Sequence, residues 1–380
     1  MEKRLKLYLN SLVANSGSDL HLKSGSHVRV RVHGVLKKLG DDLLSGEQID
    51  QLAQAITSKA QYQKLQQERS VDFTYVLDEL SRFRVNIFFQ MNGLSAVFRI
   101  IPVEIPTLEK LELPEVIGTF AEIPRGLVLV TGVTGSGKST TLAALTNRIN
   151  ETSSKHIITL EDPIEFVHRD NKALINQRAV GEDTNSFGDA LRAALREDPD
   201  IILVGEIRDL GTIDLALHAA NTGHLVFSTL HTLDAKETIN RIIGMFAKEE
   251  QNRVRGVLSS VLAGVISQRL APTISGERTA VIEVLVRTSR MAEMIADGRD
   301  KEILDVIEEG KDIYGSQTFD QHLLDLIDQR KITEETALEY ATNPSDIKLK
   351  LQGIGRESIG ESRLEDATQL DAFDLMEEED

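Results

Sequence analysis

Hydrophobic and polar residues alternate over much of the first hundred positions, as is typical of strands with one buried face. In HVRVRVHGVLKKL (27–39) the first valines fall on one side of an extended chain and the arginines on the other, and Gly34 suits a turn between two short strands. Further strands are predicted at 71–76, 83–89 and 94–101, and a helix over 45–67 with Ser45 as its N-cap. The pattern predicts a small α+β domain over residues 1–101.

The pattern changes after residue 114, where continuous apolar runs of strand length are separated by helical stretches. These runs lie at 127–131, 157–160, 201–204 and 225–228. Strands that are buried on both faces read as continuous apolar runs. The sequence therefore predicts an α/β core with a mainly parallel sheet over residues 115–275.

The remaining segments differ from both domains in composition. Residues 102–114 contain three prolines, which predicts a semi-rigid linker. Helical patterns at 287–309 and 318–341 predict a C-terminal helical region over 276–352. Residues 356–380 hold ten acidic side chains and two basic ones, so an acidic, disordered tail is predicted over 353–380.

One loop of the predicted core carries a complete phosphate-binding motif. The segment GVTGSGKS (132–139) matches G-x-x-x-x-G-K-[ST] between a predicted strand and a predicted helix. Glycines let backbone N–H groups turn toward anionic oxygens, the lysine reaches the β- and γ-phosphates, and the next hydroxyl binds Mg²⁺. ATP and Mg²⁺ are therefore the predicted cofactors, with Ser139 on the metal. The predicted binding residues are Gly132, Val133, Thr134, Gly135, Ser136, Gly137, Lys138, Ser139 and Thr140.

Two acidic clusters follow apolar runs of the core, at the strand ends where parallel sheets place their ligand sites. Glu206 follows the third run and is predicted to be the Walker B acid, which holds Mg²⁺ directly or through water. Glu165 follows the second run and is predicted to activate water. Asp162 is either a turn residue or a residue on the metal side, and Asp209 is predicted to cap a helix.

Two histidines flank the fourth apolar run. His231, at its carboxyl end, is predicted to sense the γ-phosphate through a hydrogen bond. His224 is predicted to be a hydrogen-bonding link or a subunit contact. A zinc site is a third and weaker interpretation, because no cysteine is present to complete it.

Length and composition narrow the class of protein. The chain has 380 residues, enough for two domains, and no cysteine, which excludes disulfides and a thiolate nucleophile and fits a reducing cytoplasm. The net charge of −17 argues against a broad basic surface for nucleic acid. No signal peptide and no transmembrane segment are expected.

Several blocks resemble the secretion ATPase superfamily. GVTGSGKS, TLEDPIEFVH, REDPDIILVGEIRD and TGHLVFSTLHTLDA are similar to its Walker A, Asp-box, Walker B and His-box blocks. SDLHLKSG, RFRVNIFFQ and QTFDQHLLDL resemble the pilus-retraction ATPases of the PilT and PilU type, and the likeness runs from about residue 3 to residue 352. Pilus-assembly and type II secretion relatives carry a four-cysteine metal-binding insert and a longer N-terminal region, so their absence also favours the retraction branch.

The resemblance implies a RecA-like core preceded by a PAS-like domain, in a homohexameric ring. It implies ATP-driven retraction of type IV pili for twitching motility, through an inner-membrane platform protein. The protein would be cytoplasmic, at the inner face of the inner membrane, and would bind no nucleic acid. Hydrolysis is expected to move the two domains about the 102–114 linker.

The resemblance also implies roles for individual residues. Glu165 corresponds to the general base and Glu206 to the Walker B acid, while His224 and His231 form the His-box pair. Two N-terminal arginines, Arg84 and Arg99, match arginines that reach the phosphates of a neighbouring subunit. From the residues alone these two would be ordinary arginines on the solvent-facing side of strands.

Some features point to alternatives. Residues 290–297 (RMAEMIAD) match only part of the AIRNLIRE-like block of the retraction family. The helix after QTFDQ and the acidic extension are closer to the PilU type, an accessory ATPase that acts alongside a paralogous partner ATPase, whereas the central blocks are closer to PilT. A secretion or pilus-assembly ATPase is a further alternative. A RecA-like nucleic-acid translocase conflicts with the acidic charge, and a non-hydrolysing ATP sensor conflicts with the paired acids.

Overall fold

The computed structural model describes residues 1–78, 81–102 and 104–352. The chain groups into two compact units, one formed by Met1–Ile105 with Ile158–Ala190 and the other by Pro106–Ile157 with the chain from Leu191 onward. The predicted acidic tail at 353–380 lies outside the described residues. The boundaries predicted from the sequence for the N-terminal domain, the linker, the core and the C-terminal region remain a prediction.

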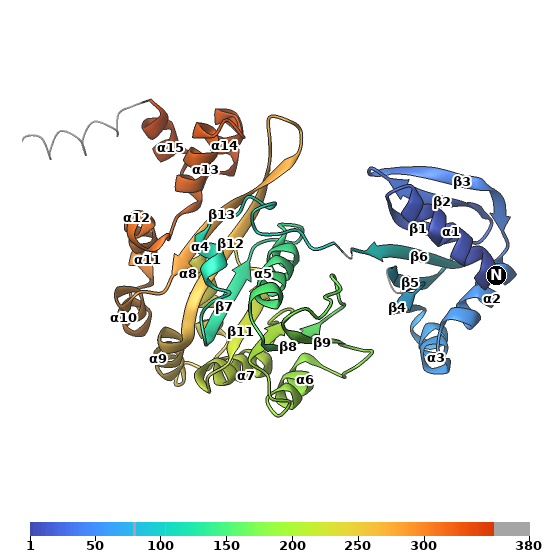
Figure 1. The fold of residues 1–380 in the computed structure, drawn as a ribbon, viewed down its shortest axis with the longest axis horizontal. Coiled ribbons are helices and arrows are strands. Elements are labelled where there is room, and N and C mark those ends of the chain that lie inside the picture. The colour runs from blue at the N-terminus through green and yellow to red at the C-terminus, as the bar shows by residue number, and fades with distance from the viewer. Residues whose placement is uncertain (79–80, 103, 353–380) are drawn as a thin grey trace, which may run out of the picture. The chain divides into compact units, whose positions relative to one another are not determined.

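The N-terminal unit is built on a six-stranded antiparallel sheet (Figure 1). The strands lie in the order β3-β2-β1-β6-β5-β4, and each neighbouring pair is antiparallel. The strands predicted on both sides of Gly34 and at 71–76, 83–89 and 94–101 are confirmed, and β1 is an additional strand. Their bounds are β1 (Gly17–Lys23), β2 (Ser26–Val32), β3 (Val35–Leu44), β4 (Ser70–Val76), β5 (Arg82–Gln90) and β6 (Gly93–Ile101).

Three helices, α1 (Glu2–Ala14), α2 (Gly46–Ile56) and α3 (Lys59–Glu68), share one apolar core with this sheet. Ser45 caps α2 as predicted, in a capping box with Gln48. The single helix predicted over 45–67 is wrong, because Ser58 forms a second capping box with Gln61 and begins a new helix. Helix α1 was not predicted from the sequence.

The second sheet has seven strands in the order β13-β12-β7-β11-β10-β8-β9. The pairs β10–β11, β11–β7 and β7–β12 are parallel, whereas β12 and β13 are antiparallel. All four predicted apolar runs are strands, so the parallel-rich α/β core is confirmed, and β13 lies beyond residue 275. The bounds are β7 (Gly126–Thr131), β8 (His156–Glu161), β9 (Leu174–Ala179), β10 (Ile201–Val204), β11 (Leu225–Leu230), β12 (Leu262–Pro272) and β13 (Arg278–Val286).

Helices follow most strands of this sheet (Figure 1). Both predicted C-terminal helical stretches are confirmed, each as a pair of short helices. In the first stretch, Gly298 ends helix α10 in a left-handed conformation with φ of 72°. The bounds are α4 (Val116–Thr119), α5 (Lys138–Thr152), α6 (Phe187–Ala194), α7 (Leu210–Asn221), α8 (Ala235–Gly244), α9 (Gln251–Val261), α10 (Ser289–Asp297), α11 (Ile303–Glu309), α12 (Lys311–Tyr314), α13 (Phe319–Asp328), α14 (Glu334–Tyr340) and α15 (Pro344–Leu351), with one 3₁₀ turn at Asp300–Glu302.

The register of the central strands brings functional loops to one edge of the sheet. Thr131, the last residue of β7, is paired with Leu230, the last residue of β11. Val204, the last residue of β10, is paired with Ser228 of β11. Because these strands are parallel, the loops that follow them emerge side by side. The glycine-rich loop, Glu206 and His231 therefore lie at the same edge.

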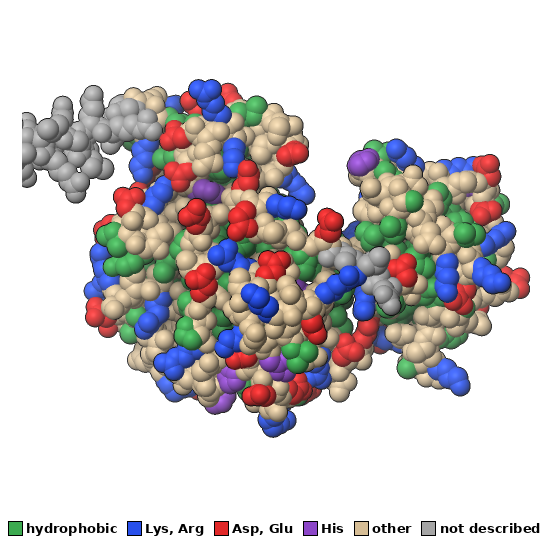
Figure 2. All heavy atoms as spheres, in the orientation of Figure 1, with side chains coloured by type: hydrophobic (Ala, Val, Ile, Leu, Met, Phe, Trp, Pro, Cys, Tyr) green, Lys and Arg blue, Asp and Glu red, His purple; other side chains and the backbone are tan. Residues whose placement is uncertain are grey.

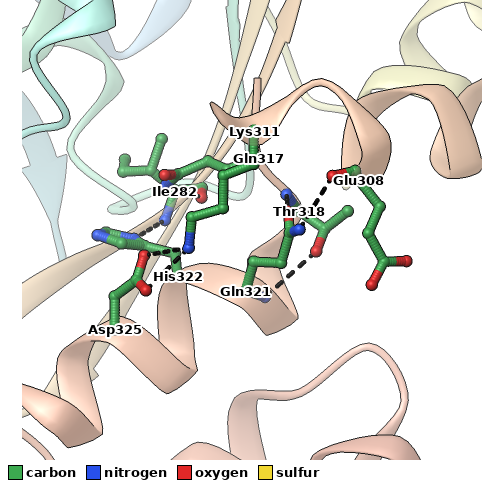
Figure 3. A network of polar contacts seen from close by, with 8 residues as sticks. All are labelled: Ile282, Glu308, Lys311, Gln317, Thr318, Gln321, His322 and Asp325. Carbon is green, nitrogen blue, oxygen red and sulfur yellow. Dashed lines mark hydrogen bonds and ion pairs between the residues drawn. The ribbon is translucent and has the colours of Figure 1, made fainter. Parts of the chain in front are cut away.

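The block QTFDQHLLDL anchors α13 to strand β13 (Figure 3). The backbone N–H of Gln317 donates to the carbonyl oxygen of Val284 at 3.0 Å, and the Gln317 side-chain amide donates to Ile282 at 3.0 Å. Nδ1 of the buried His322 accepts from the backbone N–H of Ile282 at 2.9 Å. This block therefore has a structural explanation, which is to hold a helix against β13.

The surface charge is mixed. On the face shown in Figure 2, lysine and arginine side chains are interspersed with aspartate and glutamate side chains, and no large field of one sign is visible there. Within the described residues, no helix has the length and apolar character needed to cross a membrane.

Candidate nucleotide-binding and catalytic site

The glycine-rich loop joins β7 to α5 and fits closely against β12. Gly132, Gly135 and Gly137 have φ values of 139°, 81° and 94°, which L side chains rarely adopt. A Cβ on Gly132 would lie 2.3 Å from the carbonyl oxygen of Gln268, and a Cβ on Gly137 would lie 2.7 Å from Nε2 of the same residue. Both positions therefore require glycine. The loop leads into the N-terminus of α5, where helix N–H groups and the helix dipole favour phosphate.

The lysine of the motif is buried against its own loop. Nζ of Lys138 donates to the carbonyl oxygens of Gly132 at 2.9 Å and Val133 at 3.0 Å. The hydroxyl of Ser136 is buried and makes no hydrogen bond within the described part of the chain. Buried polar groups are ordinarily hydrogen-bonded, and a phosphate oxygen in the loop would supply the partner. The loop thus fits a polyphosphate.

The other loop residues lie around this centre. Val133 and Thr134 are exposed on the outside of the loop, while Ser139 and Thr140 are half-buried in the first turn of α5. Ser139 is therefore placed beside the lysine at the start of the helix, where the motif places its metal-binding hydroxyl.

The structure brings Glu206 and His231 together. Nε2 of His231 lies 3.2 Å from Oε1 of Glu206, and a guanidinium nitrogen of Arg208 lies 2.7 Å from Oε2. Burial alone would raise the pKa of Glu206, but the hydrogen bond and charge of Arg208, with a smaller contribution from His231, hold that pKa below its usual value. Glu206 is therefore ionised at neutral pH, which is the charge state that binding of a metal ion requires.

A glutamate that the sequence analysis did not single out, Glu161, ends strand β8. Its Oε1 accepts from the hydroxyl of Thr159 at 2.7 Å and from the amide of Gln177 at 3.1 Å, and its Oε2 accepts from the backbone N–H of Glu165 at 3.3 Å. Burial raises the pKa of Glu161. The exposed Glu165 thus stands on a turn that Glu161 supports. The signal for Glu161 was its place directly after the apolar run.

Asp209, His224 and Asp162 are the other core residues that the sequence analysis discussed. Oδ1 of Asp209 accepts from the backbone N–H of Thr212 at 2.9 Å and caps α7, as predicted. His224 lies at the opposite end of β11 from the glycine-rich loop, with Nδ1 at 3.0 Å from the carbonyl oxygen of Ala219. The structure therefore does not bring His224 to the edge that carries His231. Asp162 is exposed in the turn after β8.

The two N-terminal arginines belong to a charged row across the first sheet. Arg84 and Arg99 are register partners, Asp19 is a register partner of both Arg99 and Arg31, and the row spans strands β5, β6, β1 and β2. Nε of Arg99 donates to Oδ1 of the buried Asp19 at 2.7 Å, and Nε of Arg31 lies 3.8 Å from its other oxygen. Three cations and one anion share this row, so it has a surplus of positive charge that suits an anionic ligand.

Buried polar side chains behind the glycine-rich loop gave no signal in the sequence. Gln268 on β12 is 3% exposed, and its Oε1 accepts from the hydroxyl of Thr141 on α5 at 2.9 Å. It contacts the loop through both its main chain and its side chain. Gln268 therefore fixes the glycine-rich loop and the first helix after it to the strand beside them.

Comparison with known proteins agrees with this geometry. The family described as Type II/IV secretion system protein matches residues 1–280. The chain is 46% identical over 329 residues to the type IV pilus retraction ATPase PilT of Pseudomonas aeruginosa, which covers 87% of this chain and 95% of that protein. It is 38% identical over 358 residues to the type IV pilus ATPase PilU of the same organism, which covers 94% of this chain and 92% of that protein.

A solved structure gives the same result. The crystal structure of the pilus retraction motor PilT with bound ADP matches with a TM-score of 0.84 and 44% identity, over 90% of this chain and 98% of that chain. The fold is therefore a RecA-like P-loop core with a small PAS-like domain before it. The chain binds nucleotide and hydrolyses ATP, and it belongs to the Type II/IV secretion system protein family and, within that family, to the pilus-retraction ATPases of the PilT and PilU type.

Proposed function

We propose that this chain assembles as a homohexameric, Mg-ATP-driven motor that powers type IV pilus retraction and hence twitching motility. The observation that carries the proposal is the pairing of Glu206 with His231 at the edge of the sheet that also holds the glycine-rich loop, with Nε2 of His231 at 3.2 Å from the carboxylate. The higher identity to PilT, 46% against 38% for PilU, supports a PilT-like role.

The core residues have defined roles in this mechanism. Lys138 turns from its two loop carbonyls to the β- and γ-phosphate oxygens, and the backbone of residues 132–140 cradles the polyphosphate. Glu165 takes a proton from water as the water oxygen attacks the γ-phosphorus and the bond to the β–γ bridging oxygen breaks. Glu161 positions Glu165 by accepting its backbone N–H.

Metal and sensor roles fall on the neighbouring loops. Ser139 and Glu206 would hold Mg²⁺, which neutralises phosphate charge when it is bound. His231 reports the presence of the γ-phosphate while its Nε2 stays beside Glu206. His224 acts from the other end of β11 as a structural link, through its bond to Ala219.

Arg84 and Arg99 are supplied to the phosphates of a neighbouring subunit in the ring. An arginine supplied in trans stabilises the charge of the transition state and makes hydrolysis depend on assembly. The motor acts on an inner-membrane platform protein from the cytoplasmic side of that membrane, without contacting nucleic acid.

The test is ATPase activity measured on fractions of defined oligomer size, with Lys138→Ala as the control for contaminating activity. We expect turnover in the hexamer and little in the monomer. Equal activity per chain in monomer and hexamer would exclude the trans arginines, and a folded hexamer without turnover would exclude the motor.

A deletion strain tests the direction of movement. We expect surplus surface pili and no twitching when the gene is removed. Loss of pili would instead indicate an assembly ATPase. Retraction that is restored only when a paralogous ATPase is also present would indicate the PilU-like accessory role.

A further inference from the structure

A buried glutamate links the strand before the glycine-rich loop to the helix after His231. Glu283 lies on β13 and is 2% exposed. Its Oε1 accepts from the backbone N–H of Ala235 at 2.8 Å and from the hydroxyl of Ser267 at 3.4 Å. The hydroxyl of Ser267 accepts in turn from the hydroxyl of Thr131 at 3.1 Å. One carboxylate thus connects four elements, β13, α8, β12 and β7.

Both ends of this connection adjoin the proposed ATPase site. Thr131 directly precedes Gly132, the first glycine of the phosphate loop. Ala235 is the first residue of α8, four residues after His231. A displacement of either end relative to the other therefore changes how the phosphate loop and the His231 segment face the nucleotide.

Glu283 itself has little freedom to move. Its strand neighbour Ile282 is hydrogen-bonded to Gln317 and His322, at the start of α13 (Figure 3). Its other strand neighbour, Val284, exchanges backbone hydrogen bonds with Gln317. The backbone of Glu283 is therefore fixed on the side away from the phosphate loop. A carboxylate on a fixed strand can set the separation of the two groups that donate to it.

The carboxyl group of Glu283 changes its ionisation state near neutral pH. Burial, helped by the charge of Asp234, raises the pKa of Glu283 to about 7, although the N–H of Ala235, the charge of Arg269 and the Ser267 hydroxyl oppose this rise. Ionised acceptors form hydrogen bonds roughly twice as strong as neutral ones. The hydrogen bonds that Glu283 accepts from Ala235 and Ser267 are therefore stronger above neutral pH than below it.

We propose that Glu283 is a positioning residue for ATP hydrolysis, which holds the phosphate loop and the His231 segment in their working separation. This inference rests on the proposed function, because it assigns Glu283 to the same site. Glu283 does not contact the nucleotide loop directly, so it acts through Ser267 and Thr131 on one side and through α8 on the other.

The test compares kcat and KM for ATP from pH 6 to pH 8.5 in the wild-type hexamer, Glu283→Gln and Glu277→Gln. The amide of Glu283→Gln imitates the protonated carboxyl, whereas Glu277 is an exposed carboxylate in the turn before β13 and serves as the matched control. All three proteins keep the other residues of the site, so the ratio of kcat values reports the change at position 283.

We expect kcat of the wild type, relative to Glu283→Gln, to rise about tenfold across neutrality, the size of one charge-assisted hydrogen bond. KM should differ by less than about twofold, because the loop still binds phosphate. Glu277→Gln should follow the wild type. Identical pH profiles for the wild type and Glu283→Gln would overturn the inference.

Two further measurements keep the test decisive. ADP binding and thermal unfolding show whether Glu283→Gln is folded. If it is not folded, Ser267→Ala is measured in its place. We expect the kcat of Ser267→Ala to fall while its KM for ATP stays nearly constant. An unchanged kcat in Ser267→Ala overturns the inference. A wild-type hexamer that never hydrolyses ATP overturns the proposed function itself, a different result from a pH-independent but active enzyme.

Discussion

Arg99 is bound to Asp19 through Nε alone, at 2.7 Å, and no hydrogen bond of its two Nη groups occurs within the described residues. The side chain of Arg99 is 67% exposed, whereas that of Asp19 is 4% exposed. Burial alone would raise the pKa of Asp19, but hydrogen bonds from Ser18 and Arg99 and the charge of Arg99 keep that pKa below its usual value. The ionised Asp19 thus orients the guanidinium of Arg99 through Nε. The two Nη groups of Arg99 are left to donate to an anion.

Asp19→Asn should lower the kcat of the assembled ring, because Arg99 loses the charge that orients it, and the effect should be smaller than that of Arg99→Ala. The double variant should match Arg99→Ala, since residues that act through each other are not additive. A double-variant cycle in steady-state ATPase assays measures this coupling. Asp72→Asn, which removes a carboxylate bonded to Asn86 on the same sheet, is the control. Additive losses would show that Asp19 does not act through Arg99.

Gly132 and Gly135 of the phosphate loop should differ in their tolerance of alanine. Gly132→Ala places a Cβ 2.3 Å from a backbone oxygen, whereas a Cβ on Gly135 meets nothing within 4 Å. Both substitutions strain the backbone by about 1–3 kcal/mol, but only the first adds a steric clash. Unfolding by urea without nucleotide should therefore show a clearly larger loss of stability for Gly132→Ala. Equal losses would mean that β12 does not confine the loop.

Glu165→Gln should keep ATP bound while it lowers kcat by about 100-fold or more, because the amide cannot accept a proton. Glu161→Gln keeps a single acceptor oxygen, which can face the Glu165 N–H or the Thr159 hydroxyl but not both. Its kcat should still fall much less than that of Glu165→Gln, because the proposed base itself remains. Phosphate release and equilibrium ATP binding measure the two effects separately. Normal phosphate release from Glu165→Gln would remove Glu165 from the role of general base.

The contact of α13 with β13 should weaken in acid. Burial lowers the pKa of His322 to about 4, from an ordinary value of 6.5. The unfolded chain therefore binds the proton more readily, and stability is lost as the pH falls from about 6.5 toward 4, by on the order of 2–3 kcal/mol. His322→Asn, whose side-chain oxygen can still accept from Ile282, should lack this component in urea unfolding across that pH range. His33→Asn, at an exposed turn, should retain it.

The parts of this protein that the sequence determined are local. The glycine-rich motif is contiguous, and the apolar runs before Glu206 and after His224 mark strands whatever their neighbours are, so the nucleotide site and the parallel-rich core were predictable. Ser45 was predicted as a cap because it directly precedes the helical pattern, and the structure adds a capping box with Gln48. The break at Ser58 was missed because it interrupts a helical pattern that continues on both sides.

Contacts between distant segments were decided by the tertiary structure alone. Glu206 and His231 were predicted one by one at strand ends, but their pairing follows from the adjacency of β10 and β11. Asp19 meets Arg99 across 80 residues, and Thr131 meets Ser267 across 136. A buried polar residue such as Gln268 or Glu283 has no spacing that reveals its partner, because its cost of burial is offset by groups that only the folded sheet brings near.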